Sequence, residues 1–350
     1  MNKLAVITGA TGQDGSYLVE LLISKAEYTR INCIVRRTTY LLEQSNLSQV
    51  SLKHANVHFY TADLTDQSSL KVAFHGHETA DRVEVYNLAA QSHVGVSFAC
   101  PRATAEVNYI GALNLLENIR HLDLLDKCRF YQASTSEMFG KVQEIPQTEL
   151  TPFYPRSPYG VAKMAAHWIV KNYRESYGLF ACCGILFNHE SPRRGIDFVT
   201  QKIVKGARDI MTGKIDCLEI GNMDSRRDWG HAKDYVQGMW LMLQQDTADD
   251  YVIATGEQHS VREFVEIVFD KYDIDIVWEG TGINEVGKDP KTDKVLVKIS
   301  EKFYRPCEVE TLVGDPSKIK SIGWVQTNTF ADLVGDMVGT DSRVVRKLFL

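Results

Sequence analysis

Residues 4–22 read LAVITGATGQDGSYLVELL, and this stretch decides the fold. A short apolar run from Leu4 to Thr8 stops at Gly9, Gly12 and Gly15, and apolar residues then recur at helical spacing. The pattern predicts a strand, a glycine turn and a helix whose free N–H groups can receive a pyrophosphate. The spacing is G-x-x-G-x-x-G rather than G-x-G-x-x-G, and a glycine turn is also a common structural connection. The neighbouring sequence is therefore needed to distinguish a dinucleotide-binding turn from a plain connection.

The end of the next predicted strand favours a particular dinucleotide. The apolar run Ile31–Val35 ends about twenty residues beyond the glycine turn, where an NAD-binding unit has Asp or Glu for the ribose 2′-hydroxyl. This chain has Arg36, Arg37, Thr38 and Thr39 there. Two guanidinium groups and two hydroxyls suit a 2′-phosphate, which a carboxylate would repel. The sequence therefore predicts NADP rather than NAD, the alternative being a solvated arginine pair.

Further strand-like runs alternate with helical patterns. They are Val57–Ala62, Val83–Leu88, Arg129–Ala133, Phe180–Phe187 and Tyr251–Ala254. This alternation predicts an α/β fold with a Rossmann-like, doubly wound parallel sheet. Because 350 residues exceed the roughly 250–300 that one core serves, we also expect a smaller C-terminal α/β lobe for the substrate. The expected division is a dinucleotide-binding domain of residues 1–187 with 228–256, and a substrate lobe of residues 188–227 with 257–350.

The second lobe has its own sequence signals. Ser260 and Glu263 match a capping box, residues 280–294 have the polar, glycine-containing composition of an exposed loop, and residues 329–348 are typical of an amphipathic helix. Arginines recur at positions 193, 194, 226, 227 and 305. They suit a phosphate-bearing substrate, although surface ion pairs are an equal alternative for any one of them.

The chemistry concentrates in residues 131–163, YQASTSEMFGKVQEIPQTELTPFYPRSPYGVAK. If the strand stays extended through Glu137, then Thr135 and Glu137 point to the same side. Tyr159 and Lys163 are four residues apart and share one face of a helix. A phenol with an ordinary pKa near 10 becomes a base when an ammonium and a positively charged nicotinamide favour the phenolate. These residues predict oxidation of a secondary alcohol.

Glu137 extends the reaction beyond oxidation. Thr135, Tyr159 and Lys163 suffice for a dehydrogenase or an epimerase, whereas a carboxylate beside Thr135 could also take the proton next to the new ketone. Loss of hydroxide one carbon further along, and return of the hydride there, would remove water and regenerate the cofactor. The alternative is that Glu137 is an exposed carboxylate without a role.

Motifs along nearly the whole chain resemble those of extended short-chain dehydrogenases/reductases, and most closely the GDP-mannose 4,6-dehydratase family. They are TGATGQDG, IVRRTT, ADLTD, NLAAQSHV, YQASTSE, PRSPYGVAK, LFNHESPRRG, RRDWGHAKDY, VIATGEQHSVREF and YRPCEVE. The resemblance implies dehydration of GDP-mannose to GDP-4-keto-6-deoxymannose with NADP, and a homodimer or homotetramer. An NADPH-dependent reductase, an epimerase and a silent NADP-binding scaffold stay open as alternatives.

The resemblance also implies roles for individual residues. Thr135, Glu137, Tyr159 and Lys163 would be catalytic. Contacts to NADP would come from Gly9, Ala10, Thr11, Gly12, Gln13, Asp14, Arg36, Arg37, Thr38, Thr39, Asp63, Leu64, Leu88, Ala89, Ala90, Gln91, Ser92, Lys163, His189 and Arg194. Contacts to GDP-mannose would come from Asn188, Lys202, Arg227, Arg305 and Glu308. From the residues themselves, Asp63 could bind an adenine amino group or merely cap a helix, and His93 is as easily structural as functional.

Composition limits the partners. A net charge of −6 gives no reason to expect nucleic acid or an anionic membrane. Seven cysteines without C-x-x-C, no secretory leader and no apolar run of about 18 residues lead us to expect a cytoplasmic chain with reduced thiols. We expect no metal, because His75 and His77 lack a third ligand.

Overall fold

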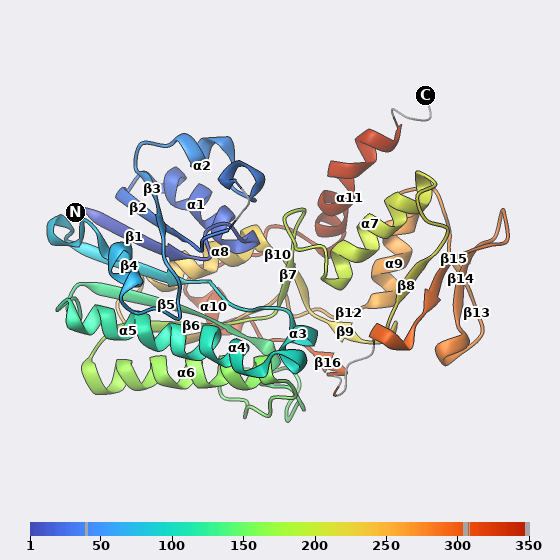
Figure 1. Ribbon diagram of the computed structural model, residues 1–350. Helices are drawn as coiled ribbons and strands as arrows, with labels where there is room; N and C mark the ends of the chain where they lie inside the picture. The colour runs from blue at the N-terminus through green and yellow to red at the C-terminus, as the bar shows by residue number, and fades with distance from the viewer. Residues whose placement is uncertain (39–40, 304–306, 308, 347–350) are drawn as a thin grey trace.

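A seven-stranded parallel sheet forms the centre of the larger lobe (Figure 1). The computed structural model describes residues 1–38, 41–303, 307 and 309–346. The strand order is β11-β6-β5-β4-β1-β2-β3, and every neighbouring pair is parallel. The strands are β1 (Lys3–Thr8), β2 (Tyr28–Val35), β3 (Val57–Thr61), β4 (Arg82–Asn87), β5 (Cys128–Thr135), β6 (Phe180–Leu186) and β11 (Asp250–Ile253). The predicted doubly wound sheet is confirmed.

Helices cover both faces of this sheet because each face is apolar. On one face, α1 (Gln13–Lys25) and α8 (Ala232–Met242) bury Leu18 and Met239. On the other face, α5 (Gly111–His121) and α6 (Pro158–Tyr177) bury Leu116 and Val170 in a second core. Figure 1 shows α1 above the sheet and α5 and α6 below it.

The order of the strands places a crevice beside β1. The chain builds outward from β1 through β2 to β3, and then returns to add β4 on the other side of β1. The connections after β1 and β4 therefore leave the sheet toward opposite faces. In open parallel sheets, ligands bind in the opening this creates at the carboxyl ends of the strands.

A smaller lobe follows, with its own core. Its sheet has the order β13-β14-β15-β8, and the core contains the fully buried side chains of Ile203, Phe264, Val297 and Leu333. Its helices are α7 (Val199–Met211), α9 (Val261–Asp270) and α11 (Phe330–Arg346). The capping box of α9 is confirmed, since Ser260 Oγ accepts from the Glu263 N–H at 3.1 Å and Glu263 Oε2 accepts from the Ser260 N–H at 2.7 Å.

The remaining elements are short. The helices are α2 (Gln49–Lys53), α3 (Val94–Ala99), α4 (Pro101–Ala105) and α10 (Ser317–Ser321), and a π-helical turn (Glu106–Ile110) joins α4 to α5. The strands are β7 (Asn188–Glu190), β8 (Leu218–Ile220), β9 (Arg226–Arg227), β10 (Trp229–His231), β12 (His259–Ser260), β13 (Val277–Glu279), β14 (Val286–Asp289), β15 (Lys294–Ile299) and β16 (Thr311–Leu312).

The expectation of an exposed loop over residues 280–294 is confirmed for residues 280–284 and 290–293, which are exposed, but it is wrong for the strand β14 between them. After a single 3₁₀ turn (Gly282–Asn284), the chain forms β14, which pairs antiparallel with both β13 and β15. The glycine that suggested a loop has a packing role instead, because a Cβ on Gly287 would lie 2.9 Å from Ile276 Cγ2. β14 is held by backbone hydrogen bonds to β13 and β15. Such bonds do not require an alternating apolar pattern, so the sequence of β14 does not show one.

The division into two lobes is looser near the C-terminus than the sequence suggests. Ile319 and Trp324 pack into the same core as α1 and α8, although they lie in the range assigned to the second lobe.

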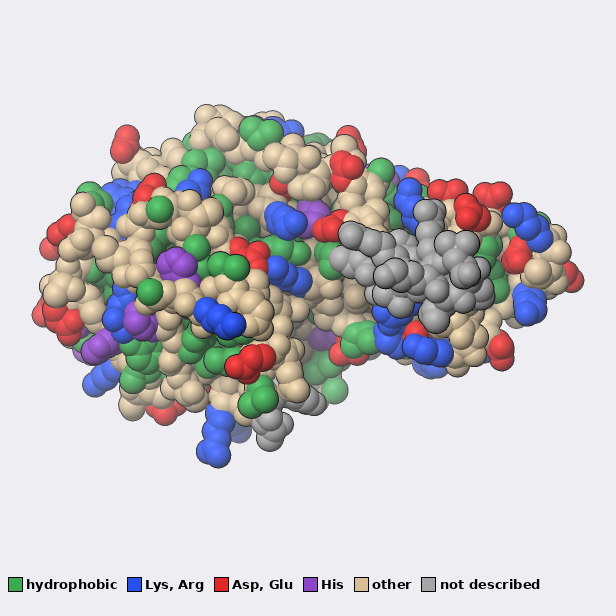
Figure 2. All heavy atoms as spheres, turned by 90° about the horizontal axis from the view of Figure 1, so that it is seen from above, with side chains coloured by type: hydrophobic (Ala, Val, Ile, Leu, Met, Phe, Trp, Pro, Cys, Tyr) green, Lys and Arg blue, Asp and Glu red, His purple; other side chains and the backbone are tan. Residues whose placement is uncertain are grey.

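Seen from above, acidic and basic side chains are interspersed over the surface (Figure 2). None of the helices in the described part of the chain combines the length and the apolar character that a membrane crossing requires.

Candidate active site

A cavity of about 810 Å³ lies at the carboxyl ends of the central strands, between the larger lobe and α7, α9 and β8 of the smaller one. Its volume is in the range of small-molecule sites, about 300–1,000 Å³. Thirteen of the predicted site residues line it: Asp14, Leu88, Ala90, Ser92, Thr135, Glu137, Tyr159, Lys163, Asn188, His189, Arg194, Lys202 and Arg227. The structure thus brings together side chains from all three predicted groups.

The glycine turn lies against the backbone that follows β4, with no room for a side chain between them. Gly9 has φ +69°, and a Cβ there would lie 2.8 Å from the backbone nitrogen of Ala89. The Gly12 N–H donates to Gly9 O at 2.9 Å, and α1 begins at the next residue without a side-chain cap. The uncapped start of this helix and the lack of side chains in the turn fit a pyrophosphate.

The start of α1 is joined to the segment after β6. His189 Nε2 donates to Asp14 Oδ2 at 2.8 Å, and Gln13 Nε2 donates to His189 O at 3.0 Å. Burial alone would raise the pKa of Asp14, but the neighbouring His189 outweighs it and the pKa lies below its ordinary value. Burial likewise disfavours the imidazolium, yet Asp14 raises the pKa of His189 above its ordinary value. The pair behaves as an ion pair between two parts of the chain.

Thr135 and Glu137 both line the cavity, but the argument that placed them together is wrong. β5 ends at Thr135, and a 3₁₀ turn (Ser136–Met138) replaces the extended backbone that was expected. Thr135 Oγ1 accepts from the Glu137 N–H at 3.3 Å and so caps this turn. The cap, not strand alternation, brings the hydroxyl and the carboxylate to the same cavity. Glu137 is 8% exposed, so it is not an exposed surface carboxylate.

Tyr159 and Lys163 occupy the first turns of α6. Ser157 Oγ accepts from the Gly160 N–H at 3.0 Å and starts the helix, with Pro158 at its first position. Burial raises the pKa of Tyr159 to about 12, although its hydrogen bond with Thr135 opposes the rise. Burial lowers the pKa of Lys163 to about 8. In the protein alone, burial therefore outweighs the effect expected from the ammonium, and a further positive charge is required to favour the phenolate.

The predicted adenosine side of the cofactor site lies beyond the cavity. Arg36, Arg37 and Thr38 follow β2 and are exposed, while Thr39 is outside the described residues. The carboxylate of Asp63 accepts from the N–H and the hydroxyl of Thr65, at 2.9 and 2.7 Å, and these bonds lower its pKa. Asp63 therefore closes a turn with Thr65 and does not cap the next helix, at whose start Asp66 Oδ1 accepts from the N–H groups of Ser68 and Ser69.

The other predicted cofactor contacts outside the cavity lining follow β1, β3 and β4. Ala10 and Gln13 are buried in the glycine turn, and Thr11 is half-buried beside them. Leu64 is buried, and the Gln91 N–H donates to Asn108 Oδ1 at 2.8 Å.

The second lobe contributes the positive side of the cavity. Lys202, on α7, has its Nζ 3.1 Å from the ring centroid of Phe303, and burial together with Lys302 lowers its pKa to about 8. Arg227, in β9, is buried, and its Nη1 donates to Arg226 O at 2.9 Å. Arg305 and Glu308 lie outside the described residues.

The two adjacent arginines 193 and 194 have different surroundings. Arg194 lines the cavity, where its Nε lies 3.0 Å from Glu190 Oε2. Arg193 turns to α1, with its Nη2 2.7 Å from Glu20 Oε1. For Arg193 the ion-pair alternative is therefore the one observed.

One residue that lines the cavity, His93, and one beside it, Asp228, gave little signal in the sequence. His93 lines the cavity, and its Nδ1 accepts from the Val96 N–H at 3.1 Å, so it also caps α3. Asp228 is fully buried next to Arg227 and accepts from the backbone N–H groups of Thr255 and Gly256, at 2.8 and 2.9 Å. Its position between Arg227 and Trp229 in the sequence does not reveal these distant partners, which hold β9 against the larger lobe.

The fold and the Thr, Glu, Tyr and Lys side chains around one cavity define an extended short-chain dehydrogenase/reductase. The family model described as GDP-mannose 4,6 dehydratase matches residues 6–337. The chain is 52% identical to GDP-mannose 4,6 dehydratase 2 of Caenorhabditis elegans, over 97% of this chain and 89% of that one. It is 50% identical to GDP-mannose 4,6 dehydratase of Homo sapiens, over 98% and 92%. The chain belongs to the GDP-mannose 4,6-dehydratase family.

Solved structures share the fold. DesIV, a dTDP-glucose 4,6-dehydratase from Streptomyces venezuelae with NAD and TYD bound, matches with a TM-score of 0.79 and 23% identity, over 97% of both chains. UDP-glucose 4-epimerase of Thermus thermophilus, in complex with NAD, matches with a TM-score of 0.76 and 25% identity, over 96% of this chain and 98% of that one. RMD from Pseudomonas aeruginosa, complexed with NADPH, matches with a TM-score of 0.72 and 21% identity, over 97% and 98%.

Proposed function

We propose that this protein converts GDP-mannose to GDP-4-keto-6-deoxymannose by removing water. The observation that carries the proposal is the convergence of Thr135, Glu137, Tyr159 and Lys163 on one cavity, in a chain of this family. The larger lobe would hold the nicotinamide cofactor, and the smaller lobe would hold the sugar nucleotide. This assignment of roles uses the division of the chain expected from the sequence.

The residues of the cavity divide the work. Tyr159, hydrogen-bonded to Thr135, takes the proton of the sugar 4-hydroxyl. When bound, a nicotinamide would supply the acceptor for the hydride of carbon 4 and its donor to carbon 6. Carbon 5 then takes up one proton, the equivalent of the one that Tyr159 received, so that only water is lost. Glu137 removes the proton from carbon 5, which the 4-ketone has acidified, and protonates the hydroxyl that leaves carbon 6 as water. Lys163 Nζ donates to Ala133 O at 2.8 Å, which fixes the ammonium beside the phenol.

NADP is the form of the cofactor that we propose. The support is the exposed pair Arg36 and Arg37 at the end of β2, where two guanidinium groups can receive a 2′-phosphate. Each charge-assisted hydrogen bond contributes about 1.5–3 kcal/mol, so replacing both arginines with Glu should abolish a preference for NADP over NAD. Calorimetric titration with both nucleotides measures this preference, with Arg120→Glu as a control. Equal affinities of the unaltered protein for NAD and NADP would contradict the proposal that NADP is its cofactor.

The reaction is tested directly with purified protein, GDP-mannose and NADP. Mass spectrometry should detect a sugar nucleotide lighter by one water, with no net consumption of the cofactor. Product of unchanged mass would overturn the dehydratase. Stoichiometric oxidation of NADPH on adding the keto sugar would indicate a reductase instead.

We propose that the protein acts as a homodimer or homotetramer. The support is the outer face of α6, where the apolar side chains of Val161 and Trp168, two turns apart, are 50% and 52% exposed. Light scattering should give a multiple of the chain mass, and Trp168→Glu should reduce it. A monomer in the unaltered protein would contradict the proposal.

We further place this oligomer in the cytoplasm, without nucleic acid or membrane partners. All seven cysteines are free thiols, and the net charge is −6. Cell fractionation tests this placement, and recovery of the protein in the membrane fraction would contradict it.

A further inference from the structure

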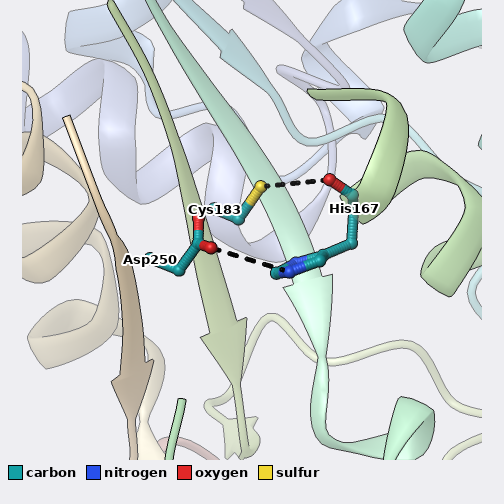
Figure 3. A group of neighbouring side chains, drawn as sticks. All are labelled: His167, Cys183 and Asp250. Carbon is teal, nitrogen blue, oxygen red and sulfur yellow. Dashed lines mark hydrogen bonds and ion pairs between the residues drawn. The ribbon is translucent and has the colours of Figure 1, made fainter. Parts of the chain in front are cut away.

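α6 carries a buried histidine that the reaction does not use. His167 lies one turn beyond Lys163 and is 3% exposed. Figure 3 shows its ring facing Asp250 of β11, with Asp250 Oδ2 3.7 Å from His167 Nε2, while the thiol of Cys183 in β6 points to the backbone oxygen of His167. On the other side of the ring, Ser134 Oγ lies 3.1 Å from Nδ1. Ser134 immediately precedes the catalytic Thr135.

The three side chains could be mistaken for a metal site, since His, Cys and Asp donor atoms lie within 4.8 Å of one another. Two observations argue against this. Arg174 already binds the carboxylate of Asp250, so that its charge is compensated. Cys183 Sγ donates to the backbone oxygen of His167 at 3.8 Å, so the thiol proton already has an acceptor within the protein. The cluster is therefore better described as a set of polar contacts that connects α6 to β5, β6 and β11.

The direction of the hydrogen bond to Ser134 follows from the charge state of the ring. Burial lowers the pKa of His167 to about 4, so the imidazole is neutral and carries one N–H. The carboxylate of Asp250 favours that proton on Nε2. Nδ1 is then an acceptor, and the Ser134 hydroxyl donates to it. Asp250 and Arg174 thus fix the tautomer through which the ring holds Ser134.

His167 makes one of three hydrogen bonds, here called ties, that connect α6 to the end of β5. Lys163 Nζ donates to Ala133 O at 2.8 Å, His167 holds the side chain of Ser134, and Tyr159 is hydrogen-bonded to Thr135. The three strand residues are consecutive, and the three helix residues are spaced by four, so they share one helix face. Ser134 and Thr135 are adjacent at the end of β5, so holding the first against α6 restrains the backbone from which the side chain of the second enters the cavity.

We propose that His167 is a positioning residue for Thr135: by holding Ser134 against α6, it sets the angle at which the Thr135 hydroxyl meets Tyr159. The inference rests on the proposed function, because it concerns the same proton-transfer pair. Displacements of about 1 Å can slow a reaction on the order of a hundredfold. Loss of one of three ties should therefore reduce kcat about tenfold without changing ligand binding.

The first test compares two substitutions of the histidine. His167→Phe keeps a ring that can pack edge-on against Phe153, whose centroid is 5.2 Å away, but it removes both nitrogens. His167→Asn places a polar atom near the former Nδ1. We expect His167→Phe to lower kcat and the rate at which bound nicotinamide is reduced about tenfold, with dissociation constants for GDP-mannose and NADP within about twofold. His167→Asn should recover most of the rate.

The second test is a double-mutant cycle with Ser134→Ala. Both single changes remove the same hydrogen bond, so the double variant should be no slower than either one. Tyr173→Phe is the matched control, because it removes the hydrogen bond of another buried α6 side chain, to Glu117, away from the cavity. The control should lower the melting temperature and leave kcat unchanged. Ser134→Ala also tests the tie if His167→Phe does not fold.

Three results would overturn the inference. They are an unchanged kcat in His167→Phe and Ser134→Ala, additive losses in the double variant, and a stoichiometric metal that is lost with His167. An unaltered protein that does not dehydrate GDP-mannose would instead refute the proposed function, so the two failures are distinguishable.

Discussion

Glu137→Gln separates the two halves of the proposed reaction. Glu137 is 8% exposed in the cavity wall, and its backbone N–H is held by Thr135 Oγ1 at 3.3 Å. The amide has the same shape as the carboxylate and leaves the backbone bond in place, so the turn should be preserved. A positioned general base contributes about 10²–10⁴-fold, equivalent to about 3–5 kcal/mol of barrier. Dehydration should therefore slow by that factor, whereas hydride transfer from carbon 4 should continue.

The assay follows both halves in one experiment. Mixing the variant with GDP-mannose and NADP should produce near-ultraviolet absorbance of reduced cofactor, while mass spectrometry detects little loss of water. The control is Glu78→Gln, because the Glu78 side chain is 67% exposed in the turn before β4, at the opposite end of the strands. Dehydration by Glu137→Gln at the rate of the unaltered protein would refute the reasoning.

Three further changes test other parts of the structure. Tyr159→Phe removes the hydroxyl that Thr135 contacts, so reduction of bound cofactor should fall about 10²–10⁴-fold; an unchanged stopped-flow rate would exclude Tyr159 as the base. Gly9→Ala places a methyl group 2.8 Å from Ala89 N at φ +69°, so the unfolding free energy should fall by about 1–3 kcal/mol, and an unchanged melting temperature would contradict this. The lowered pKa of His167 means that the unfolded chain binds more protons between pH 6.5 and about 4, so stability is lost as pH falls through this window, by up to about 3 kcal/mol. His167→Phe should reduce the dependence on pH of the unfolding free energy, measured by urea denaturation, because it removes only this titrating group and retains Asp250, Lys171 and Arg174. The same slope of unfolding free energy against pH in both proteins would contradict a buried neutral histidine.

Local patterns predicted the parts of the site that local geometry builds. The glycine turn after β1 and the pair Tyr159 and Lys163 depend on residues within one or two turns of each other, so spacing was sufficient. Glu137 was assigned to the cavity by an argument from strand alternation, although a 3₁₀ turn capped by Thr135 brings it there. Glu137 does line the cavity, as the sequence predicts, but the capped 3₁₀ turn and not an extended strand places it there.

Features built from distant residues were not predictable in this way. Ser134 and His167 are 33 residues apart, and Asp250 belongs to another strand, so nothing near His167 marks its partners. Asp228 likewise gains its hydrogen bonds from Thr255 and Gly256, through tertiary contacts alone. β14 was missed because its glycine makes room for Ile276, which only the packed sheet reveals.

The contact between Asp14 and His189 has a consequence for synthesis of the chain. The two residues are separated by 175 positions, so the glycine turn leaves the ribosome long before the segment that closes against it. A nascent chain that ends before His189 has the helix start but not its ion-pair partner. From the proposed function we therefore expect full affinity for the dinucleotide only after the segment that contains His189 has closed against the glycine turn.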